Sequence, residues 1–562
     1  MDQKPRPNTF DAIVVGTGIS GGWAAKELCE RGLDTLVLER GRDVQHVVDY
    51  TTAHQAPWEL PNGDQLTALE RKKKHVQIRS EIVEPSNQHW FVDDDEHPYI
   101  EEKPFDWIRG YHVGGRSLTW GRHSYRWSDL DFEANAREGV GVDWPLRYRE
   151  LAPWYDHVEA FIGVAGTAEK LPQLPDGKFL PPMPLNCLEA HVAERLRARM
   201  PERRLIIGRA AHLTQAHLGR GQCMYRNLCM RGCPFGAYFS SNAATLPAAV
   251  ATRKLTLRPH SVVTEVLYDD RAGKAVGVRV VDAQTKKTED FFARVIFLNA
   301  STLGTTFILL NSVSRRFPNG LGNDSGELGH NLMDHQFMTG AFGNHAGFAD
   351  RYYSGRRPTS AYIPRFRNVK TKTSRYLRGF GYQAGASRED WTRTIAELSV
   401  GAALKQAIAE PGPWRMGMTA FGECLPHHDN RVRLDRERPD PFGLPQLAIS
   451  AEHRENERNM RSDMLDSAAE ILEAAGFSSV ETFDLPSPLG SCIHEMGTAR
   501  MGRDPKTSVL NGNNQVHGAP NVFVTDGACM TSSACQNPSL TYMALTARAA
   551  AFAVSELDKG HL

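Results

Sequence analysis

The stretch that most constrains the fold of this chain is residues 11–39, DAIVVGTGISGGWAAKELCERGLDTLVLE. Asp11–Val15 runs into apolar, β-branched residues, as a buried parallel strand does. A glycine-rich turn follows, and then a helix that continues through Trp23–Arg31 and is stopped by Gly32. Thr35–Leu38 has the pattern of a second strand. The order strand, turn, helix, strand predicts a β–α–β unit.

The turn has the spacing Gly16-x-Gly18-x-x-Gly21. The first glycine permits the tight turn, the second lets the backbone approach a pyrophosphate, and the third lets the helix pack closely on the strand. Glu39 ends the second strand, where an acid binds a ribose diol and disfavours a 2′-phosphate. A glycine-rich loop at an unrelated junction is the alternative. The agreement of strand, helix and acid favours a bound dinucleotide, FAD or NAD rather than NADP.

Length and charge exclude several classes of protein. A chain of 562 residues is too long for one simple core, so two domains are expected. The 66 basic and 66 acidic side chains balance, so neither nucleic acid nor an anionic membrane is expected as a partner. The sequence contains no apolar run of about 18 residues, so no membrane span is predicted. The first residues, MDQKPRPNTFDAIVV, contain no apolar export signal.

Two further segments are expected to contact the same cofactor. The adjacent Gly114 and Gly115 suggest backbone that passes close to a flat or charged group, although a plain turn has the same composition. Ala293–Leu298 predicts a strand that opens through Asn299–Gly304 into a helix, which repeats the geometry of the first turn. Residues 42–104 are polar, and we expect them to form a lid or a subunit contact.

Three of the nine cysteines fall in one Gly- and Pro-rich loop. Cys223, Cys229 and Cys233 have the spacing C-x5-C-x3-C-P. Three thiols this close can converge on one metal centre, and a proline after the last cysteine is found in iron–sulfur loops. No fourth cysteine or histidine follows at close range, which favours an iron–sulfur cluster over a closed zinc site. Zinc, and a disulfide with one free thiol, are the alternatives.

The catalytic candidates flank a predicted C-terminal strand. Asn521–Thr525 ends in Asp526 and Gly527, and His494 lies on a glycine-punctuated loop before it. Asn537 lies after it, at the start of the final helix. Histidine has a pKa near neutrality, so it can act as a base without a large shift of its pKa.

Together these motifs resemble the GMC oxidoreductases, the glucose–methanol–choline family of FAD enzymes. The matching segments are GTGISGG at 16–22, GGRSLTW at 114–120, NASTLGTTFILLNS at 299–312, LGHNLMDH at 328–335, HEMGTARMG at 494–502 and NPSLTYMAL at 537–545. The resemblance implies an α/β fold. A Rossmann-type FAD-binding domain would be built from discontinuous segments and joined to an α+β substrate domain with an antiparallel sheet.

The resemblance also implies roles for single positions. His494 and Asn537 match the family's active-site pair. His494 would take the hydroxyl proton of an alcohol whose carbon gives up a hydride, and Asn537 would hold the same hydroxyl. Arg500 and His335 are expected only to support the fold. Thr119 stands where some sugar-oxidising relatives attach flavin covalently, so non-covalent FAD is expected. The positions implied in cofactor binding are Gly16, Gly18, Gly21, Glu39, Gly115, Ser117, Val263, Ala300, Asp526 and Gly527.

Most members of the family lack the cysteine triplet. Its spacing resembles that of bacterial multi-subunit sugar dehydrogenases, whose flavin subunit carries a 3Fe–4S cluster; here Cys223, Cys229 and Cys233 would be the ligands. In those enzymes a small Tat-exported subunit carries the catalytic subunit across the membrane, and a cytochrome c accepts the electrons. The resemblance implies a periplasmic chain without its own signal, with a cytoplasmic location as the alternative. RNLCMRGCPFGAYFSSN is similar to the glucoside 3-dehydrogenase type.

The predicted domains are discontinuous. The FAD-binding domain is expected to comprise residues 1–45, 105–135, 205–345 and 490–562, with the iron–sulfur loop at 221–237. The substrate-binding domain and lid are expected to comprise residues 46–104, 136–204 and 346–489. In the last segment, short β-like runs such as Leu398–Ala402 alternate with Gly and Pro turns.

The expected function is oxidation of a secondary alcohol of a sugar or glycoside, with the 3-hydroxyl of a pyranoside preferred. Hydride would pass to FAD, and electrons would leave through the cluster to a cytochrome c subunit. One alternative is an oxidase that uses oxygen, and another is a dehydrogenase of a different sugar, polyol or sugar acid. A flavin electron carrier or assembly subunit is the non-enzymatic alternative.

Overall fold

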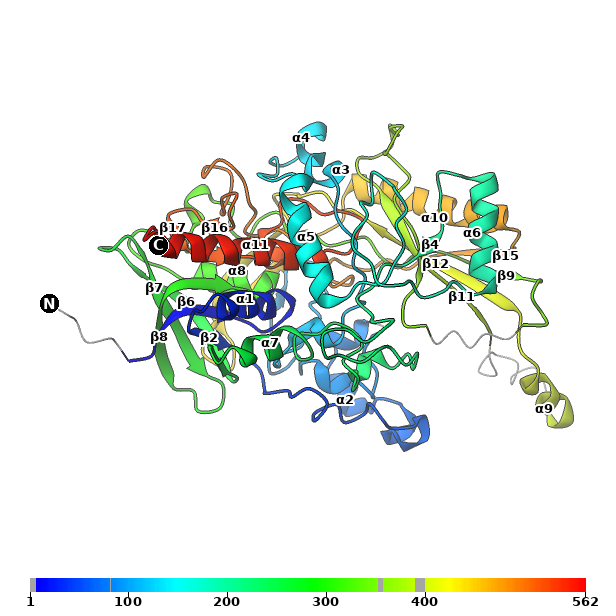
Figure 1. Ribbon diagram of the computed structural model, residues 1–562, viewed down its shortest axis with the longest axis horizontal. Helices are drawn as coiled ribbons and strands as arrows, with labels where there is room; N and C mark the ends of the chain where they lie inside the picture. The colour runs from blue at the N-terminus through cyan, green and yellow to red at the C-terminus, as the bar shows by residue number, and fades with distance from the viewer. Residues whose placement is uncertain (1–6, 81, 352–356, 390–399) are drawn as a thin grey trace.

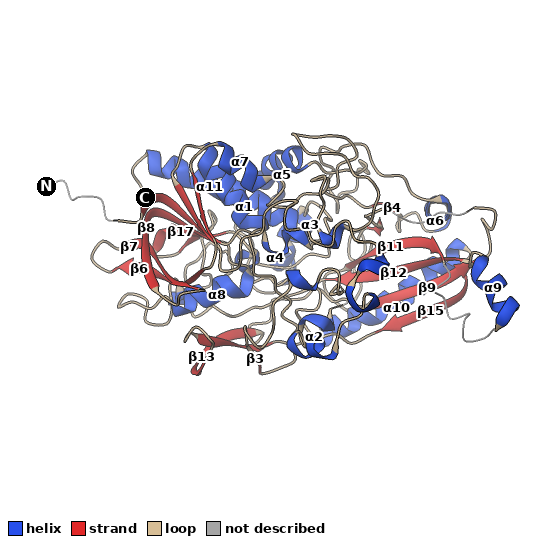
Figure 2. Cartoon of the chain, turned by 90° about the horizontal axis from the view of Figure 1, so that it is seen from below, coloured by secondary structure: helices blue, strands red, loops and turns tan. Residues whose placement is uncertain are grey.

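The computed structural model describes residues 7–80, 82–351, 357–389 and 400–562. A mostly parallel sheet, with the N-terminal strand and the C-terminal helix, occupies one end of the long axis (Figure 1). An antiparallel sheet occupies the other end (Figure 2). Within the described residues, no helix combines the length and the apolar character needed to cross a membrane.

The first sheet has eight strands in the order β16-β17-β8-β1-β2-β5, with β7 paired to β8 and β6 paired to β7. Strands β17, β8, β1, β2 and β5 run parallel, as the sequence predicts for β1 and β2. The strands are β1 (Thr9–Val15), β2 (Thr35–Leu38), β5 (Leu255–Arg258), β6 (Ser261–Asp269), β7 (Lys274–Asp282), β8 (Thr288–Leu298), β16 (Gln515–Val516) and β17 (Ala519–Val524).

Helices cover both faces of this sheet. Val14 packs with α1 and α11 on one face, whereas Ile13 packs with α8 on the other, and both side chains are fully buried. A strand buried on both faces is continuously apolar, which explains the sequence of β1. The helices that surround the sheet are α1 (Ile19–Glu30), α5 (Tyr148–Ile162), α7 (Thr245–Ala251), α8 (Thr302–Asn311) and α11 (Ser539–Asp558).

The second sheet has six antiparallel strands in the order β15-β9-β12-β11-β10-β4. It confirms the predicted antiparallel sheet. Helix α10 packs on it and contacts α6 (Figure 1). The elements are β4 (Ile206–Ile207), β9 (Thr339–His345), β10 (Ala361–Ile363), β11 (Phe380–Arg388), β12 (Trp414–Gly422), β15 (Ser478–Asp484), α6 (Cys187–Arg199) and α10 (Glu455–Ala475).

Two details of the predicted organisation are wrong. Strands β4 and β9 fall inside the segment 205–345 assigned to FAD binding, but they pair with β10 and β12 of the antiparallel sheet. Sheet membership depends on partners distant in sequence, so local pattern does not locate this boundary. Residues 398 and 399 of the predicted strand Leu398–Ala402 lie outside the described residues. From residue 401 the chain is helix α9 (Gly401–Ala409), whose Ala, Leu, Lys and Gln residues favour a helix.

A third, small sheet joins a strand of the region 42–104 to a hairpin of residues 431–450. It consists of β3 (Ile100–Glu101), β13 (Arg431–Pro439) and β14 (Pro445–Ser450), in the order β13-β14-β3. Besides β3, the described residues of the region 42–104 form mostly turns and short 3₁₀ helices, together with the α-helix α2 (Ala68–Lys73). Its buried Tyr50 and Trp90 pack with Leu118 of the glycine-rich loop, so this region lies against the predicted cofactor segments. Helices α3 (Asp129–Phe132) and α4 (Ala134–Glu138) precede α5.

Candidate active site

The first glycine turn has the steric constraints that the sequence predicts. Gly16 has φ +95°, and a Cβ there would lie 2.4 Å from the carbonyl oxygen of Asn299. A Cβ at Gly21 would lie 2.0 Å from the carbonyl oxygen of Gly16, so this glycine permits close packing of α1 on β1. A Cβ at Gly18 would meet no atom within 4 Å, and Gly18 lines a cavity. The open space at Gly18 fits the approach of a pyrophosphate.

Substitution of two of these glycines separates packing from cofactor binding. We expect Gly21→Ala to destabilise the protein by about 1–3 kcal/mol, because backbone must move to admit the methyl group. Gly18→Ala meets no protein atom, so we expect it to weaken FAD binding while the thermal unfolding midpoint of the FAD-free protein stays near that of the wild type. Differential scanning calorimetry and FAD titration check the pair. Equal destabilisation of both FAD-free variants would contradict this assignment.

One cavity collects the predicted cofactor residues. Every one of them except Gly21 lines it: Gly16, Gly18, Glu39, Gly115, Ser117, Val263, Ala300, Asp526 and Gly527. Gly21 is instead buried in α1. His494 and Asn537 line the same cavity, so the nucleotide turn and the catalytic candidates share one space. Ile82, His97 and Pro98 of the region 42–104 also line it, which agrees with a covering role for that region.

Glu39 has protein partners as well as a place at the cavity. Its Oε2 accepts hydrogen bonds from the backbone N–H (3.1 Å) and the hydroxyl (2.5 Å) of Thr17, and its Oε1 accepts one from the N–H of Gly41 (3.0 Å). Burial raises the pKa of Glu39, whereas these donors oppose that shift. A carboxylate has about four acceptor sites, and these donors occupy three of them, so about one remains for a ribose hydroxyl.

Hydrogen bonds tie the second glycine loop to the first turn. The N–H of Gly114 donates to the hydroxyl of Thr17 (2.9 Å). Ser241 links both loops, because its N–H donates to Oγ of Ser117 (3.0 Å) and its hydroxyl donates to the carbonyl of Gly18 (2.9 Å). The loop 114–118 is therefore a second wall of the same cavity.

The catalytic candidates lie side by side in the cavity. Nδ2 of Asn537 is 3.4 Å from Nε2 of His494, although the two residues come from different loops. Burial, followed by the neighbouring His335, Arg116 and His123, lowers the pKa of His494 well below 6.5. His494 is therefore neutral at neutral pH and has a lone pair with which to accept a proton.

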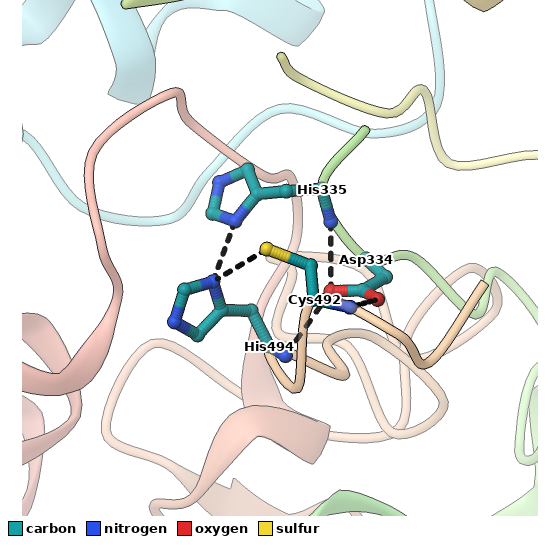
Figure 3. A group of neighbouring side chains, drawn as sticks. All are labelled: Asp334, His335, Cys492 and His494. Carbon is teal, nitrogen blue, oxygen red and sulfur yellow. Dashed lines mark hydrogen bonds between the residues drawn. The ribbon is translucent and has the colours of Figure 1, made fainter. Parts of the chain in front are cut away.

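Asp334 and His335 contact His494 or its loop, although the sequence predicts no catalytic role for either residue (Figure 3). Nδ1 of His335 is 2.8 Å from Nδ1 of His494. Asp334 accepts backbone N–H bonds from Gly490 (2.8 Å), Cys492 (3.1 Å) and His494 (3.1 Å). Asp334 therefore fixes the path of the loop that carries His494.

An ion pair fixes the other side of this loop. A guanidinium nitrogen of Arg116 is 2.7 Å from Oε2 of the buried Glu495, and the same side chain donates to the carbonyl of Ile493 (3.2 Å). Arg116 belongs to the glycine loop, so the cofactor wall and the histidine loop are held together. Arg500 pairs instead with Glu327 (3.0 Å), away from the cavity lining, as expected of a residue that supports the fold.

The cysteine loop lies against the cofactor wall. Arg122, a residue of the cavity lining, donates to the carbonyls of Leu118 (3.1 Å) and Cys229 (3.0 Å). All nine cysteines are free thiols, so the predicted disulfide alternative is not formed. His212 Nε2 lies 3.7 Å from Sγ of Cys229, a neighbour that the spacing did not reveal because His212 precedes the triplet in sequence.

Comparison with known proteins gives the family. The model of the N-terminal domain of GMC oxidoreductases matches residues 10–337, and the model of the C-terminal domain matches residues 426–546. The chain belongs to the GMC oxidoreductase family, whose members bind FAD and act on alcohol and sugar donors.

Three relatives of this chain have names that refer to different donors. The chain is 28% identical to 2-methyl-1,2-propanediol dehydrogenase of Mycolicibacterium austroafricanum, covering 96% of this chain and 94% of that protein. It is 25% identical to the fructose dehydrogenase large subunit of Gluconobacter japonicus, covering 98% of each. It is 29% identical to C-glycoside 3-oxidase of Microbacterium trichothecenolyticum over 54% of each chain.

Proposed function

We propose that this chain is an FAD-dependent dehydrogenase that oxidises a secondary alcohol of a sugar or glycoside, with the 3-hydroxyl of a pyranoside as the preferred site. Electrons would leave through a 3Fe–4S cluster held by Cys223, Cys229 and Cys233 to a cytochrome c subunit. The observation that carries the proposal is the single cavity shared by the glycine turn and the His494–Asn537 pair. Similarity to a fructose dehydrogenase and to a C-glycoside 3-oxidase supports the substrate class.

The two catalytic residues have distinct tasks. When bound, FAD supplies the acceptor for the hydride. Nε2 of His494 takes the proton of the substrate hydroxyl, and Nδ2 of Asn537 donates a hydrogen bond to the same oxygen. Two contacts on one oxygen orient the C–H bond for hydride loss.

The lowered pKa of His494 makes a prediction for the pH dependence. A base must be unprotonated, so activity is present above its pKa and is lost as the pH falls through it. Because burial lowers the pKa of His494 well below 6.5, we expect kcat/KM to stay level as the pH falls through 6.5 and to decline only at lower pH. Steady-state kinetics with a soluble electron acceptor check this. A half-maximal value at pH 6.5 or above would contradict it.

The cysteine loop offers three free, partly exposed thiols, Cys223, Cys229 and Cys233, as ligands for the cluster. His212, with Nε2 3.7 Å from Sγ of Cys229, would supply a fourth ligand, so a mononuclear zinc site is the alternative here. The contact of Arg122 with both Leu118 and Cys229 supports short-range electron transfer from the cofactor cavity.

The partner and the location belong to the same proposal. A relative that is named a large subunit supports a multi-subunit enzyme. A small subunit with a Tat signal would carry this chain to the periplasm. Co-expression with and without a candidate small subunit, followed by cell fractionation, tests this. Periplasmic recovery of the chain expressed alone would contradict dependence on a partner.

An oxygen-using sugar oxidase is the second candidate, and similarity to a C-glycoside 3-oxidase favours it. The two functions differ in the electron acceptor. We expect the purified protein to oxidise methyl glycosides rapidly with ferricyanide and slowly with oxygen. Peroxide formation that keeps pace with sugar oxidation in air, from protein without iron, would establish the oxidase instead.

A further inference from the structure

His335 lies between two partners in the wall of the active site. One ring nitrogen, Nδ1, is 2.8 Å from Nδ1 of His494. The other, Nε2, makes a short hydrogen bond with the carbonyl oxygen of Ala534. His335 is 2% exposed, so water does not compete for either contact.

The carbonyl of Ala534 sets the direction of these hydrogen bonds. A carbonyl oxygen can only accept, so Nε2 of His335 must carry a proton. Burial lowers the pKa of His335 to about 4, so its ring is neutral at neutral pH and Nδ1 is left with a lone pair. That lone pair can only accept, and Nδ1 of His494 must therefore be the donor. Nε2 of His494 then holds the lone pair.

The hydrogen bonds on the other side of His494 run in the same donor-to-acceptor direction. Without substrate, the lone pair on Nε2 accepts from Nδ2 of Asn537, at 3.4 Å; a bound substrate hydroxyl takes over this lone pair and accepts from Nδ2 instead. The amide oxygen of Asn537 then faces Nε2 of Gln383, which donates to it over 3.1 Å. Gln383 is a residue of β11, in the antiparallel sheet of the second domain.

We propose that Gln383, Asn537, His494, His335 and the carbonyl of Ala534 form a one-directional hydrogen-bond chain that fixes the tautomer of the base. In this chain His335 and Gln383 are positioning residues, each acting on His494 through a hydrogen bond or through Asn537. The inference rests on the proposed role of His494 as the base. It adds that the second domain sets the protonation pattern of the active site through Gln383.

The other groups around His494 are compatible with this tautomer. Sγ of Cys492 is 3.5 Å from Nδ1 of His494, farther than the nitrogen of His335. Burial raises the pKa of Cys492 well above 9, so it remains a thiol and adds no charge. Arg116 and His123 act on His494 electrostatically, and the carboxylate of Asp334 bonds to its backbone N–H rather than to its ring.

The fixed tautomer matters for the proton that leaves the substrate. The O–H bond breaks and its proton moves to Nε2, while the adjacent C–H hydrogen leaves with both electrons as hydride. His494 becomes a cation, and its Nδ1–H bond to the lone pair of His335 becomes a charge-assisted hydrogen bond. His335 thereby stabilises the protonated base without taking the proton itself.

Two variants of Gln383 test the direction of the chain. In Gln383→Glu, the carboxylate can only accept, so Asn537 must turn its NH₂ toward it and its oxygen toward His494. This arrangement requires a proton on Nε2 and removes the base. We expect flavin reduction at pH 8 to be ~10-fold slower than in Gln383→Leu, although Glu has the shape of Gln. The rate in Gln383→Glu should rise as the pH falls, because a protonated carboxyl can donate again.

The result is read by anaerobic stopped-flow measurement of flavin reduction between pH 5 and 9 with a methyl glycoside. If only the shape of the Gln383 side chain matters, Gln383→Glu should be the faster variant and its pH profile should follow that of the wild type. That result would overturn the proposed hydrogen-bond chain. Flavin reduction in the wild type shows separately that the proposed function holds. If the wild-type flavin is not reduced by any alcohol, the function fails before the chain is tested.

A second pair of variants tests the other end of the hydrogen-bond chain, at His335. His335→Asn keeps an acceptor near the place of Nδ1, whereas His335→Leu has almost the same shape and no acceptor. We expect His335→Leu to lower kcat for flavin reduction ~10–100-fold with little change in KM, and His335→Asn to recover most of the loss. His428→Leu, at an exposed histidine, is the control for the loss of an imidazole. Equal rates in His335→Asn and His335→Leu, with FAD bound in both, would overturn the role of His335.

Discussion

Replacing His494 with alanine should lower the rate of flavin reduction by an alcohol substrate by ~10²–10⁴-fold, the usual contribution of a general base. The loss should appear in kcat rather than in FAD content, because we expect the glycine turn and the loop 114–118, which line the cavity, to provide most of the contacts to FAD. Asp334 and the ion pair of Arg116 with Glu495 hold the loop by its backbone and by other side chains, so the loop should keep its course. Anaerobic stopped-flow absorbance is the measurement.

His428→Ala is the matched control for His494→Ala. His428 is exposed and stacks on His330, outside the cavity lining, so its loss should leave the rate unchanged. If His494→Ala retained full flavin reduction, the assignment of the base would be wrong. Loss of FAD from His494→Ala would instead show that the loop supports cofactor binding.

Replacing Cys229 with serine should remove the cluster and stop electron transfer to a cytochrome acceptor, while flavin reduction by the sugar remains. Serine is a poor ligand for iron, and Cys229 is the cysteine whose backbone is tied through Arg122 to the cofactor wall. We expect at least a tenfold loss of cytochrome reduction and loss of the signal of an oxidised three-iron cluster in the EPR spectrum. Iron analysis and EPR of protein purified without oxygen check this.

Cys187→Ser is the control for Cys229→Ser. Cys187 is also a free, partly exposed thiol, but it lies at the start of α6 in the second domain. Its loss should change neither the iron content nor cytochrome reduction. Retention of iron in Cys229→Ser would show that the cysteine triplet does not hold the metal.

Local pattern was sufficient to predict the first β–α–β unit. The strand Thr35–Leu38 agrees with the structure to the residue, because its apolar run and the helix end at Gly32 both mark it. The sheet membership of β4 and β9 was not predictable in this way, because it depends on pairing with β10 and β12, far away in sequence.

The site was predictable where a motif carries its own chemistry. His494 and Asn537 could be chosen because a histidine and an amide flank one predicted strand, and the structure places them 3.4 Å apart. His335 was assigned only to the fold, yet it contacts His494. The adjacent Asp334 and His335 in LGHNLMDH were a signal for it, but sequence spacing does not show that two distant loops meet.

The most direct test of the proposed function is an anaerobic titration of the purified protein with methyl glycosides, followed by flavin absorbance and EPR together. The proposal predicts that the flavin is bleached by a pyranoside with a free 3-hydroxyl and less by its 3-deoxy analogue, and that the signal of the oxidised three-iron cluster then disappears. FAD-loaded protein whose flavin no sugar, glycoside or alcohol bleaches would contradict it.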